Sequence, residues 1–254
     1  MLIMGLMVRE KKYVSPKQAL WLLGTGVIVG LHWVTFFLAI KISTVSIAVV
    51  CMSAATLFTS FLEPVIFKRR YFFSEFILSV AVSIGVMVIF GFETSYTVGI
   101  LVGLLSAFFS ALFNVLNGLY VKTMSSRIIT QYEMLGGFLT AAAFLLVEGQ
   151  LSADTFSISG SDWLYLIILA TICTTFAFMA SIWVMKFVTP FTVSISVNLE
   201  PVYTIVIALI LDYVNQTNKE KMSDGFYLGG AIIILAILVH AWIKTKKSRN
   251  NFLG

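Results

Sequence analysis

Long apolar runs separated by short polar segments repeat along the whole chain. Eight runs are long enough to cross a bilayer as helices, at about 20–40, 44–67, 72–91, 98–121, 130–148, 163–185, 190–212 and 226–243. A spanning helix needs about 20 apolar residues, whereas a spanning strand is about 10 residues long and alternates apolar with polar positions. These runs are too long for strands and do not alternate. The pattern therefore predicts an all-α membrane protein, a polytopic bundle of eight full transmembrane helices.

A shorter apolar run, residues 1–8, precedes these spans and is followed by Arg9, Glu10, Lys11 and Lys12. A helix that rises about 1.5 Å per residue cannot cross about 30 Å of hydrocarbon with so few residues. A signal peptide is not favoured, because no charged region precedes the run and no small-residue cleavage site follows it. We interpret the run as an N-terminal stub, the last part of a further helix.

The composition agrees with a membrane protein: 59% of the residues are hydrophobic and 11% are charged. A soluble domain has about 45–50% apolar and about 25% charged residues, so an ordinary soluble enzyme, a disordered chain and a fibrous chain are all excluded. The net charge of +5 does not indicate nucleic-acid binding, because the basic residues lie in short loops between apolar runs.

The distribution of these basic residues predicts an orientation. If the loop before the first full span is cytoplasmic, 14 of the 17 Lys and Arg residues fall inside, and the exceptions are Lys41, Lys219 and Lys221. Short cytoplasmic loops carry such an excess of Lys and Arg. The orientation places the basic tail 244–254, and with it the C-terminus, in the cytoplasm.

The first and last groups of spans, 20–91 and 163–243, are similar in length, spacing and loop character. A shift of 145 residues aligns Lys41 with Lys186 and Gly85 with Gly230. Five spans separate the two starts, and because five is odd the two units cross the membrane in opposite directions. Inverted-topology repeats are typical of secondary transporters, which bind substrate near the midplane between the repeats.

Five segments and one tripeptide carry a more specific pattern. The segments are GLHWVTFFLAIKIS (Gly30–Ser43), PVIFKRR (Pro64–Arg70), TTFAFMASIWVMKFVTP (Thr174–Pro190), VNLEPVYTIVIALIL (Val197–Leu211) and GFYLGGAIIILA (Gly225–Ala236). The tripeptide is Leu199-Glu200-Pro201, which matches an element of the ninth helix of a known family. In order, spacing and charge bias, nearly the whole chain resembles the EamA-type members of the drug/metabolite transporter superfamily.

The resemblance implies ten helices in two inverted five-helix repeats, with both ends cytoplasmic. The first repeat would occupy residues 1–91, without family helix one and most of helix two, and the second would occupy 98–243. The loop 213–224 departs from the family by being longer and more polar. The resemblance also implies a bacterial inner-membrane protein that exports small amino-acid-like or other polar or amphipathic metabolites by alternating access.

The implied partners are a small-molecule substrate, a coupled proton or sodium ion, and the lipid bilayer, without nucleic acid. A homodimer is compatible with the sequence, but nothing indicates one. The alternative function is that of a truncated or non-transporting membrane protein with a structural or interaction role. Counterflow of a labelled metabolite in proteoliposomes separates the two functions.

Polar residues inside the spans are candidates for the substrate pathway, because a charge at the bilayer centre costs roughly 2.5–3.5 kcal/mol. Glu200 lies near the middle of span 190–212. The polar residues that share its helix face are Thr192, Ser196 and Tyr203. Glu200 either binds a substrate amine or a coupling proton, or has a structural role at backbone that Pro201 leaves unbonded in a kinked helix.

The remaining pathway candidates are His32, Trp33, Thr35, Thr56, Asn114, Asn117, Thr175 and Asn198. His32 is either a hydrogen-bonded packing residue or part of a proton relay. The two asparagines of span 98–121 are larger than helix packing requires, whereas Ser and Thr side chains often bond to their own helix. Two pairs of glycines, Gly26 with Gly30 and Gly99 with Gly103, predict close helix packing.

Glu63 and Pro64 repeat part of the tripeptide near the cytoplasmic end of span 44–67. The favoured interpretation is an interfacial ion pair of Glu63 with Lys68, about one helical turn away, while Pro64 kinks the helix. No zinc-binding His-Glu-x-x-His, nucleophile elbow or phosphate-binding loop is present in the sequence. We therefore expect neither an enzyme nor an ATP-driven pump, and no cofactor or metal site.

Overall fold

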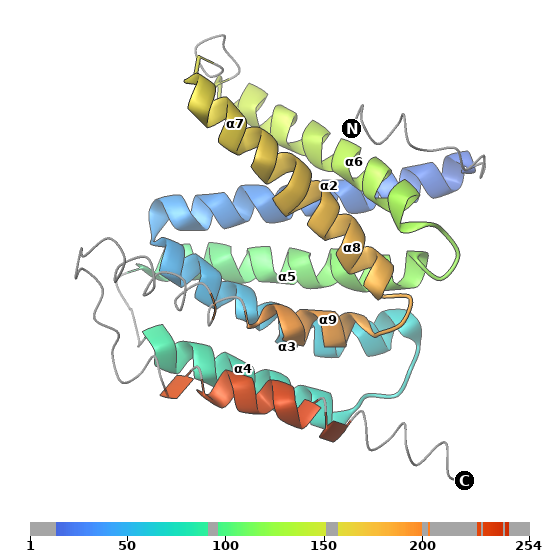
Figure 1. Cartoon of the computed structure of the whole chain (residues 1–254), viewed down its shortest axis with the longest axis vertical. Helices are drawn as coiled ribbons and strands as arrows, with labels where there is room; N and C mark the ends of the chain where they lie inside the picture. The colour runs from blue at the N-terminus through green and yellow to red at the C-terminus, as the bar shows by residue number, and fades with distance from the viewer. Residues whose placement is uncertain are drawn as a thin grey trace.

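The computed structural model describes residues 14–90, 96–150, 157–199, 203, 228–229, 231–240 and 242–243, and the regular elements of this part are helices (Figure 1). They are α2 (Pro16–Ile42), α3 (Val45–Phe67), α4 (Phe73–Phe90), α5 (Thr97–Tyr120), α6 (Ser126–Val147), α7 (Gly160–Ile168), η3 (Leu169–Phe176), α8 (Ala177–Val184) and α9 (Pro190–Val197). A last helical segment covers Ala231–His240. The prediction of an all-α protein is confirmed for this part of the chain.

Five helices are long and apolar enough to cross a membrane: Pro16–Ile42, Ile47–Phe67, Thr97–Tyr120, Ser126–Val147 and Gly160–Val184. Each coincides with one of the eight predicted spans. Shorter apolar helices, at Phe73–Gly85 and Ala231–His240, lie within two more. Of the predicted span 190–212, the structure describes α9, Asn198, Leu199 and Tyr203. The stub 1–8, the whole loop 213–224 and the tail 244–254 lie outside the described residues.

The helix starts follow from polar residues at the borders of the apolar runs. The residues whose side chains accept a backbone N–H from the first turn are Ser15, Thr44, Ser125, Ser159 and Thr189. Such caps satisfy donors that a helix leaves unpaired at its N-terminus. They explain why these helices begin within a few residues of the predicted spans.

The central helix of the bundle is α5, which packs along α2 on one side and α3 on the other (Figure 1). Helix α6 packs along α2, and α4 and α9 pack against α3. The glycines allow this close approach: a Cβ added at Gly26 would lie 2.5 Å from the Glu133 carbonyl oxygen of α6, and one at Gly103 would lie 2.8 Å from the Cys51 Cβ of α3. The close packing predicted from the glycine pairs is confirmed.

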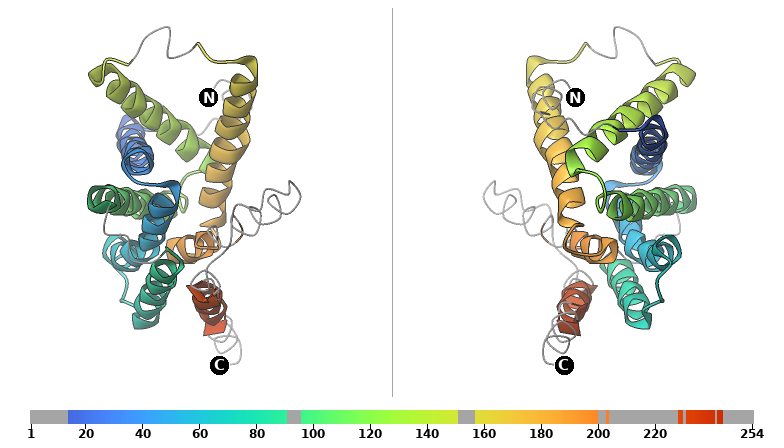
Figure 2. Two further views of the ribbon diagram at one scale, coloured as in Figure 1. Left: turned by 90° about the vertical axis from the view of Figure 1, so that its left-hand side faces the viewer. Right: turned by 90° about the vertical axis from the view of Figure 1, so that its right-hand side faces the viewer.

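Helix α9 has its own apolar core, in which Phe191 and Ile195 pack with Leu78 and Val82 of α4 and with Ile233 of the last segment. The opposite side of the molecule is more open. Residues 157–173, which include α7, are exposed, and Figure 2 shows α7 diverging from α6 toward the end where α6 stops and α7 begins. The predicted span 163–185 is one long helical rod, but its middle is a π-helix, η3, rather than α-helix throughout.

Candidate functional site

The middle of the bundle contains a buried polar contact between α3 and α9. Thr56 is the twelfth of the 23 residues of α3, so it lies at mid-depth. Its hydroxyl lies 3.2 Å from the Ser194 hydroxyl and accepts a hydrogen bond from the Asn198 side-chain amide. The Thr59 hydroxyl, which donates to the Ala55 carbonyl at 2.7 Å, lies 3.5 Å from the Ser194 hydroxyl. These four buried residues, which we call the α3–α9 polar network, include the candidates Thr56 and Asn198.

A second polar contact joins α2 to α5 at similar depth. The Ser106 hydroxyl donates to the backbone carbonyl of His32 at 3.0 Å, and the His32 Nδ1 lies 3.1 Å from the Ser106 carbonyl oxygen. A carbonyl can only accept, so Nδ1 is the donor in this contact. The ring also lies against Phe113, with centroids 5.6 Å apart. His32 thus bonds Ser106 of α5 through one ring nitrogen and through its own backbone carbonyl.

A third polar contact, between α5 and α6, contains a residue that the sequence analysis missed. The Asn117 side-chain amide donates to Glu133 Oε2 at 2.9 Å, and both residues have 0% exposure. The predicted span starts at residue 130, which places Glu133 in its first turn, where an acidic residue is unremarkable. The helix in fact begins at Ser126, so Glu133 is its eighth residue and lies two turns inside. The sequence did contain one signal for Glu133, because it is a carboxylate within an apolar run.

The end of α3 carries an ion-pair cluster. Arg69 Nη2 lies 3.1 Å from Glu63 Oε1 and 2.7 Å from Glu75 Oε2, and the other Glu63 oxygen accepts the Phe191 backbone N–H at 2.8 Å. We call these three charged residues and the Phe191 amide the Glu63 cluster. The predicted pairing of Glu63 with Lys68 is wrong. Lys68 ends α3 with a φ of 51°, and this left-handed turn brings the next residue back to the carboxylate.

The Glu63 cluster also ties α3 to the start of α9. Phe191 is in the first turn of α9, where backbone N–H groups are unpaired and the helix dipole favours a negative charge. The buried Glu63 carboxylate supplies that charge from another helix. Pro64 follows it in the last part of α3, and the helix continues through the proline to Phe67. Helices α3 and α9 are therefore joined by polar contacts both at mid-depth and at this end.

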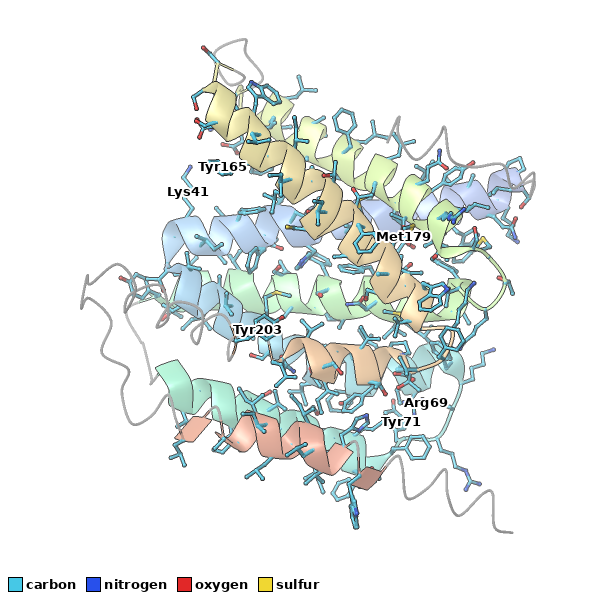
Figure 3. The ribbon with its side chains drawn as sticks, viewed as in Figure 1. Lys41, Arg69, Tyr71, Tyr165, Met179 and Tyr203 are labelled. Atoms are coloured by element: carbon cyan, nitrogen blue, oxygen red, sulfur yellow. The ribbon has the colours of Figure 1, made fainter. Side chains whose placement is uncertain are left out.

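The two ends of the bundle differ in the number of basic residues that they carry. Figure 3 shows Lys41 and Arg69 at opposite ends of the helices. The end with Arg69 also contains Lys68, Arg70, Lys122 and Lys186, because α3, α5 and α8 all finish there. Lys41 lies at the end that carries few basic residues.

The other candidates are not part of these contacts. Trp33 packs on α6, where a Cβ added at Gly137 would lie 2.8 Å from its ring. Thr35 donates to the Leu31 carbonyl of its own helix at 2.7 Å, and Thr175 donates to the Ala170 carbonyl at 2.7 Å within η3. Asn114 is half-buried, and Tyr203 is exposed on the surface (Figure 3). Glu200 and Pro201 lie outside the described residues.

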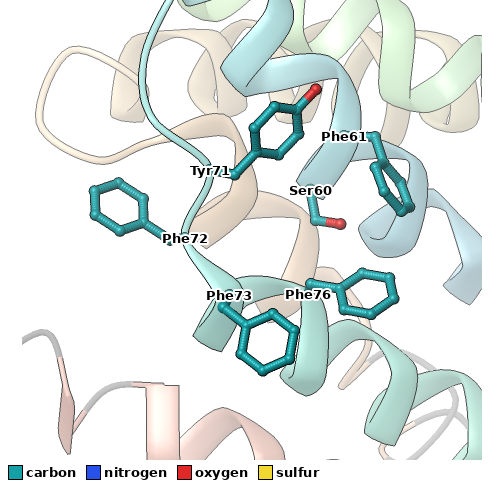
Figure 4. Close-up of a pocket in the computed structure, with 6 residues that line it drawn as sticks. All are labelled: Ser60, Phe61, Tyr71, Phe72, Phe73 and Phe76. Atoms are coloured by element: carbon teal, nitrogen blue, oxygen red, sulfur yellow. The ribbon is translucent and has the colours of Figure 1, made fainter.

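An aromatic pocket lies beside the Glu63 cluster (Figure 4). It has a volume of about 250 Å³ and is lined by Ser60, Phe61, Tyr71, Phe72, Phe73 and Phe76. Of these residues, Tyr71 is of a type that is enriched at the membrane–water interface. Within the described part of the chain, no group of three or more His, Cys, Asp or Glu side chains is placed to hold a metal ion.

Comparison with known proteins identifies the family. A sequence model of the EamA-like transporter family matches residues 1–91 and 97–242. A solved structure described only as "Crystal structure of protein" is similar with a TM-score of 0.71 and 17% identity, over 95% of this chain and 81% of that chain. At that identity, the similarity shows the fold alone. No curated protein matches the chain. Because the family match covers nearly the whole chain, the protein belongs to the EamA-like transporter family of the drug/metabolite transporter superfamily and is an integral membrane protein.

Proposed function

We propose that the protein is a secondary-active carrier that moves small polar or amphipathic metabolites, such as amino-acid-like solutes, across the membrane by alternating access. The observation that carries the proposal is the α3–α9 polar network, a set of buried hydroxyl and amide groups at mid-depth. It joins a helix of the first matched segment to a helix of the second.

The chemistry of this network suits a polar solute. Buried polar groups are costly unless they are hydrogen-bonded, and here they bond to one another across two helices. A solute with amine, carboxylate or hydroxyl groups can replace these bonds one for one when it enters between the helices. An apolar solute would leave the same groups unpaired. The network therefore favours a small solute with several hydrogen-bonding groups.

The proposal includes a topology and a direction. Eight full spans would form two inverted repeats, 1–91 and 98–243, of the family's five-plus-five pattern, with the tail 244–254 in the cytoplasm of a bacterial cell and export as the direction. The polar contacts between α3 and α9 at mid-depth and at the Arg69 end support a conformation closed on the cytoplasmic side. Transport then requires α3 and α9 to separate at that end.

Counterflow in proteoliposomes tests the proposal. Vesicles containing the purified chain are loaded with one unlabelled solute from a panel of amino acids and related metabolites, and uptake of the same labelled solute is measured. We expect accumulation for at least one solute. Ser194→Ala removes a buried hydroxyl of the network and should slow uptake about tenfold, the effect of one net hydrogen bond.

Ser196→Ala is the matched control, because Ser196 lies on the same helix, is exposed, and bonds its own backbone at Thr192. Equal effects of the two substitutions would contradict the assignment of the network as the solute site. Folded protein that accumulates none of the solutes would contradict transport itself and support a structural or interaction role.

A further inference from the structure

Three oxygens between α5 and α6 are buried without a hydrogen-bond partner. They are Asn117 Oδ1, Thr130 Oγ1 and Glu133 Oε1, and each of their residues has 0% exposure. The Asn117 amide nitrogen donates to Glu133 Oε2 at 2.9 Å, which leaves the amide oxygen of Asn117 and the other carboxylate oxygen of Glu133 unpaired. Buried polar atoms in folded proteins are nearly always satisfied, so three together indicate a missing partner.

The three side chains come from two helices that meet at this level. Thr130 and Glu133 are three residues apart and so share a face of α6, and Asn117 reaches Glu133 from α5. Helix α2 lies directly against α6 here, since a Cβ at Gly26 would lie 2.5 Å from the Glu133 carbonyl oxygen. Helix α6 starts at the basic end of the bundle, and Glu133 lies about 10 Å from that start along the helix axis.

No Lys or Arg of the described residues forms an ion pair with Glu133. From α5 it faces Asn117 and Tyr120, and the Tyr120 hydroxyl lies 3.4 Å from that of Thr25 on α2. Ile182 of α8 and Met185, which follows this helix, add apolar side chains to the same region. Among the described residues, the ion pairs that form are those of Arg69 with Glu63 and Glu75. A buried carboxylate without a counterion is strongly unfavourable.

We propose that Glu133, Asn117 and Thr130 form a binding site for one monovalent cation, a proton or a sodium ion, that neutralises the Glu133 carboxylate. A sodium ion would take the three free oxygens as ligands. A proton on Oε1 would instead convert one of these oxygens into a donor for the others. The assignment of this cation as the coupling ion rests on the proposed transport function, whereas the site itself does not.

Thermal unfolding of the purified full chain in detergent tests the site. A ligand that binds only the folded state raises Tm as its concentration increases. A sodium site predicts that Tm rises when sodium replaces a large organic cation at constant ionic strength and high pH. A proton site predicts that Tm rises as the pH falls in sodium-free buffer. Glu133→Gln, which is neutral and similar in shape, should lose the response that the wild type shows.

Glu148→Gln is the matched control, because Glu148 is exposed at the other end of the same helix, and it should keep the wild-type response. Identical dependence of the wild type and Glu133→Gln on both cations would overturn the site. If Glu133→Gln does not fold, radiolabelled sodium binding and the infrared band of a protonated carboxylic acid are measured on the wild type and on Asn117→Ala. Absence of both signals in the wild type also overturns the site.

The cation response of Tm and the counterflow assay together separate this inference from the proposed function. A cation response without counterflow would leave the site standing and remove transport. Counterflow without a cation response would support transport and contradict the cation site. The two outcomes are separable because neither experiment depends on the other.

Discussion

The buried polar side chains are paired across helices, so the effect of removing one depends on the partner that it leaves behind. Glu63→Ala leaves the Phe191 N–H unpaired and takes one of two carboxylates from Arg69. We expect it to lower the free energy of unfolding by about 1.5–3 kcal/mol, the contribution of a hydrogen bond to a charged group. Glu63→Gln should cost less, because its amide oxygen can still accept from Phe191. Denaturant unfolding in mixed micelles measures both.

Arg70→Gln serves as the control for this prediction, since Arg70 is exposed in the loop that contains Arg69. Its free energy of unfolding should equal that of the wild type. If Glu63→Ala were no less stable than Arg70→Gln, the Glu63 cluster would contribute nothing to the contact between α3 and α9.

Some residues of the candidate site could be selected by residue type alone, whereas others depend on where a helix or turn places them. Thr56 and Asn198 could be selected because hydroxyl and amide groups are unusual in apolar runs, and both are in the network. Glu133 was missed because its importance depends on where α6 begins, and a sequence pattern defines a helix end only to within a few residues. The partner of Glu63 was misassigned because the left-handed residue Lys68 reverses the chain, and no turn residue marks it.

Contacts between whole helices depend on a few small residues. Gly26→Ala would place a Cβ 2.5 to 2.9 Å from backbone atoms of Glu133 and Gly136, which cannot move without shifting α6. We expect it to lower the free energy of unfolding by about 1–3 kcal/mol, as overpacking does. Because α6 carries Glu133, the cation response of Tm should weaken as well. Thermal and denaturant unfolding measure the two effects.

Gly24→Ala is the matched control on the same helix. A Cβ at Gly24 meets nothing within 4 Å, so only the helix propensity changes. Alanine in place of a helical glycine should leave stability unchanged or raise it by up to about 1 kcal/mol. Equal losses for the two substitutions would show that backbone propensity, rather than the contact between α2 and α6, explains the effect.

The helices themselves were largely predictable, but their internal form was not. Polar caps such as Thr44 and Ser125 stand where apolar runs begin, so the starts of α3 and α6 follow from local chemistry. The π-helix η3 has no such marker. Its backbone bonds span five residues, and the Thr175 hydroxyl also donates to the carbonyl of Ala170, five residues earlier. An apolar run looks the same in either helix form.

At the scale of the whole molecule, the sequence predicts that helices cross the membrane but not which helices meet. Thr56 and Asn198 are 142 positions apart in the chain, yet they share a hydrogen bond. Nothing in the local pattern of either segment specifies the other as its partner. The central place of α5 likewise depends on the packing of several faces at once.

The orientation of the molecule decides on which side of the membrane the Glu63 cluster lies. Basic residues concentrate at the end with Arg69, so that end should face the cytoplasm. In a background with Cys51→Ala and Cys173→Ser, which removes both native thiols, a membrane-impermeant maleimide should label Ser161→Cys in intact cells. It should label Arg127→Cys only after the membrane is opened, because Arg127 and Ser161 are both exposed but begin helices at opposite ends of the bundle. The reverse labelling pattern would place the Glu63 cluster on the outer side, and it would contradict the proposal that the carrier is closed on its cytoplasmic side.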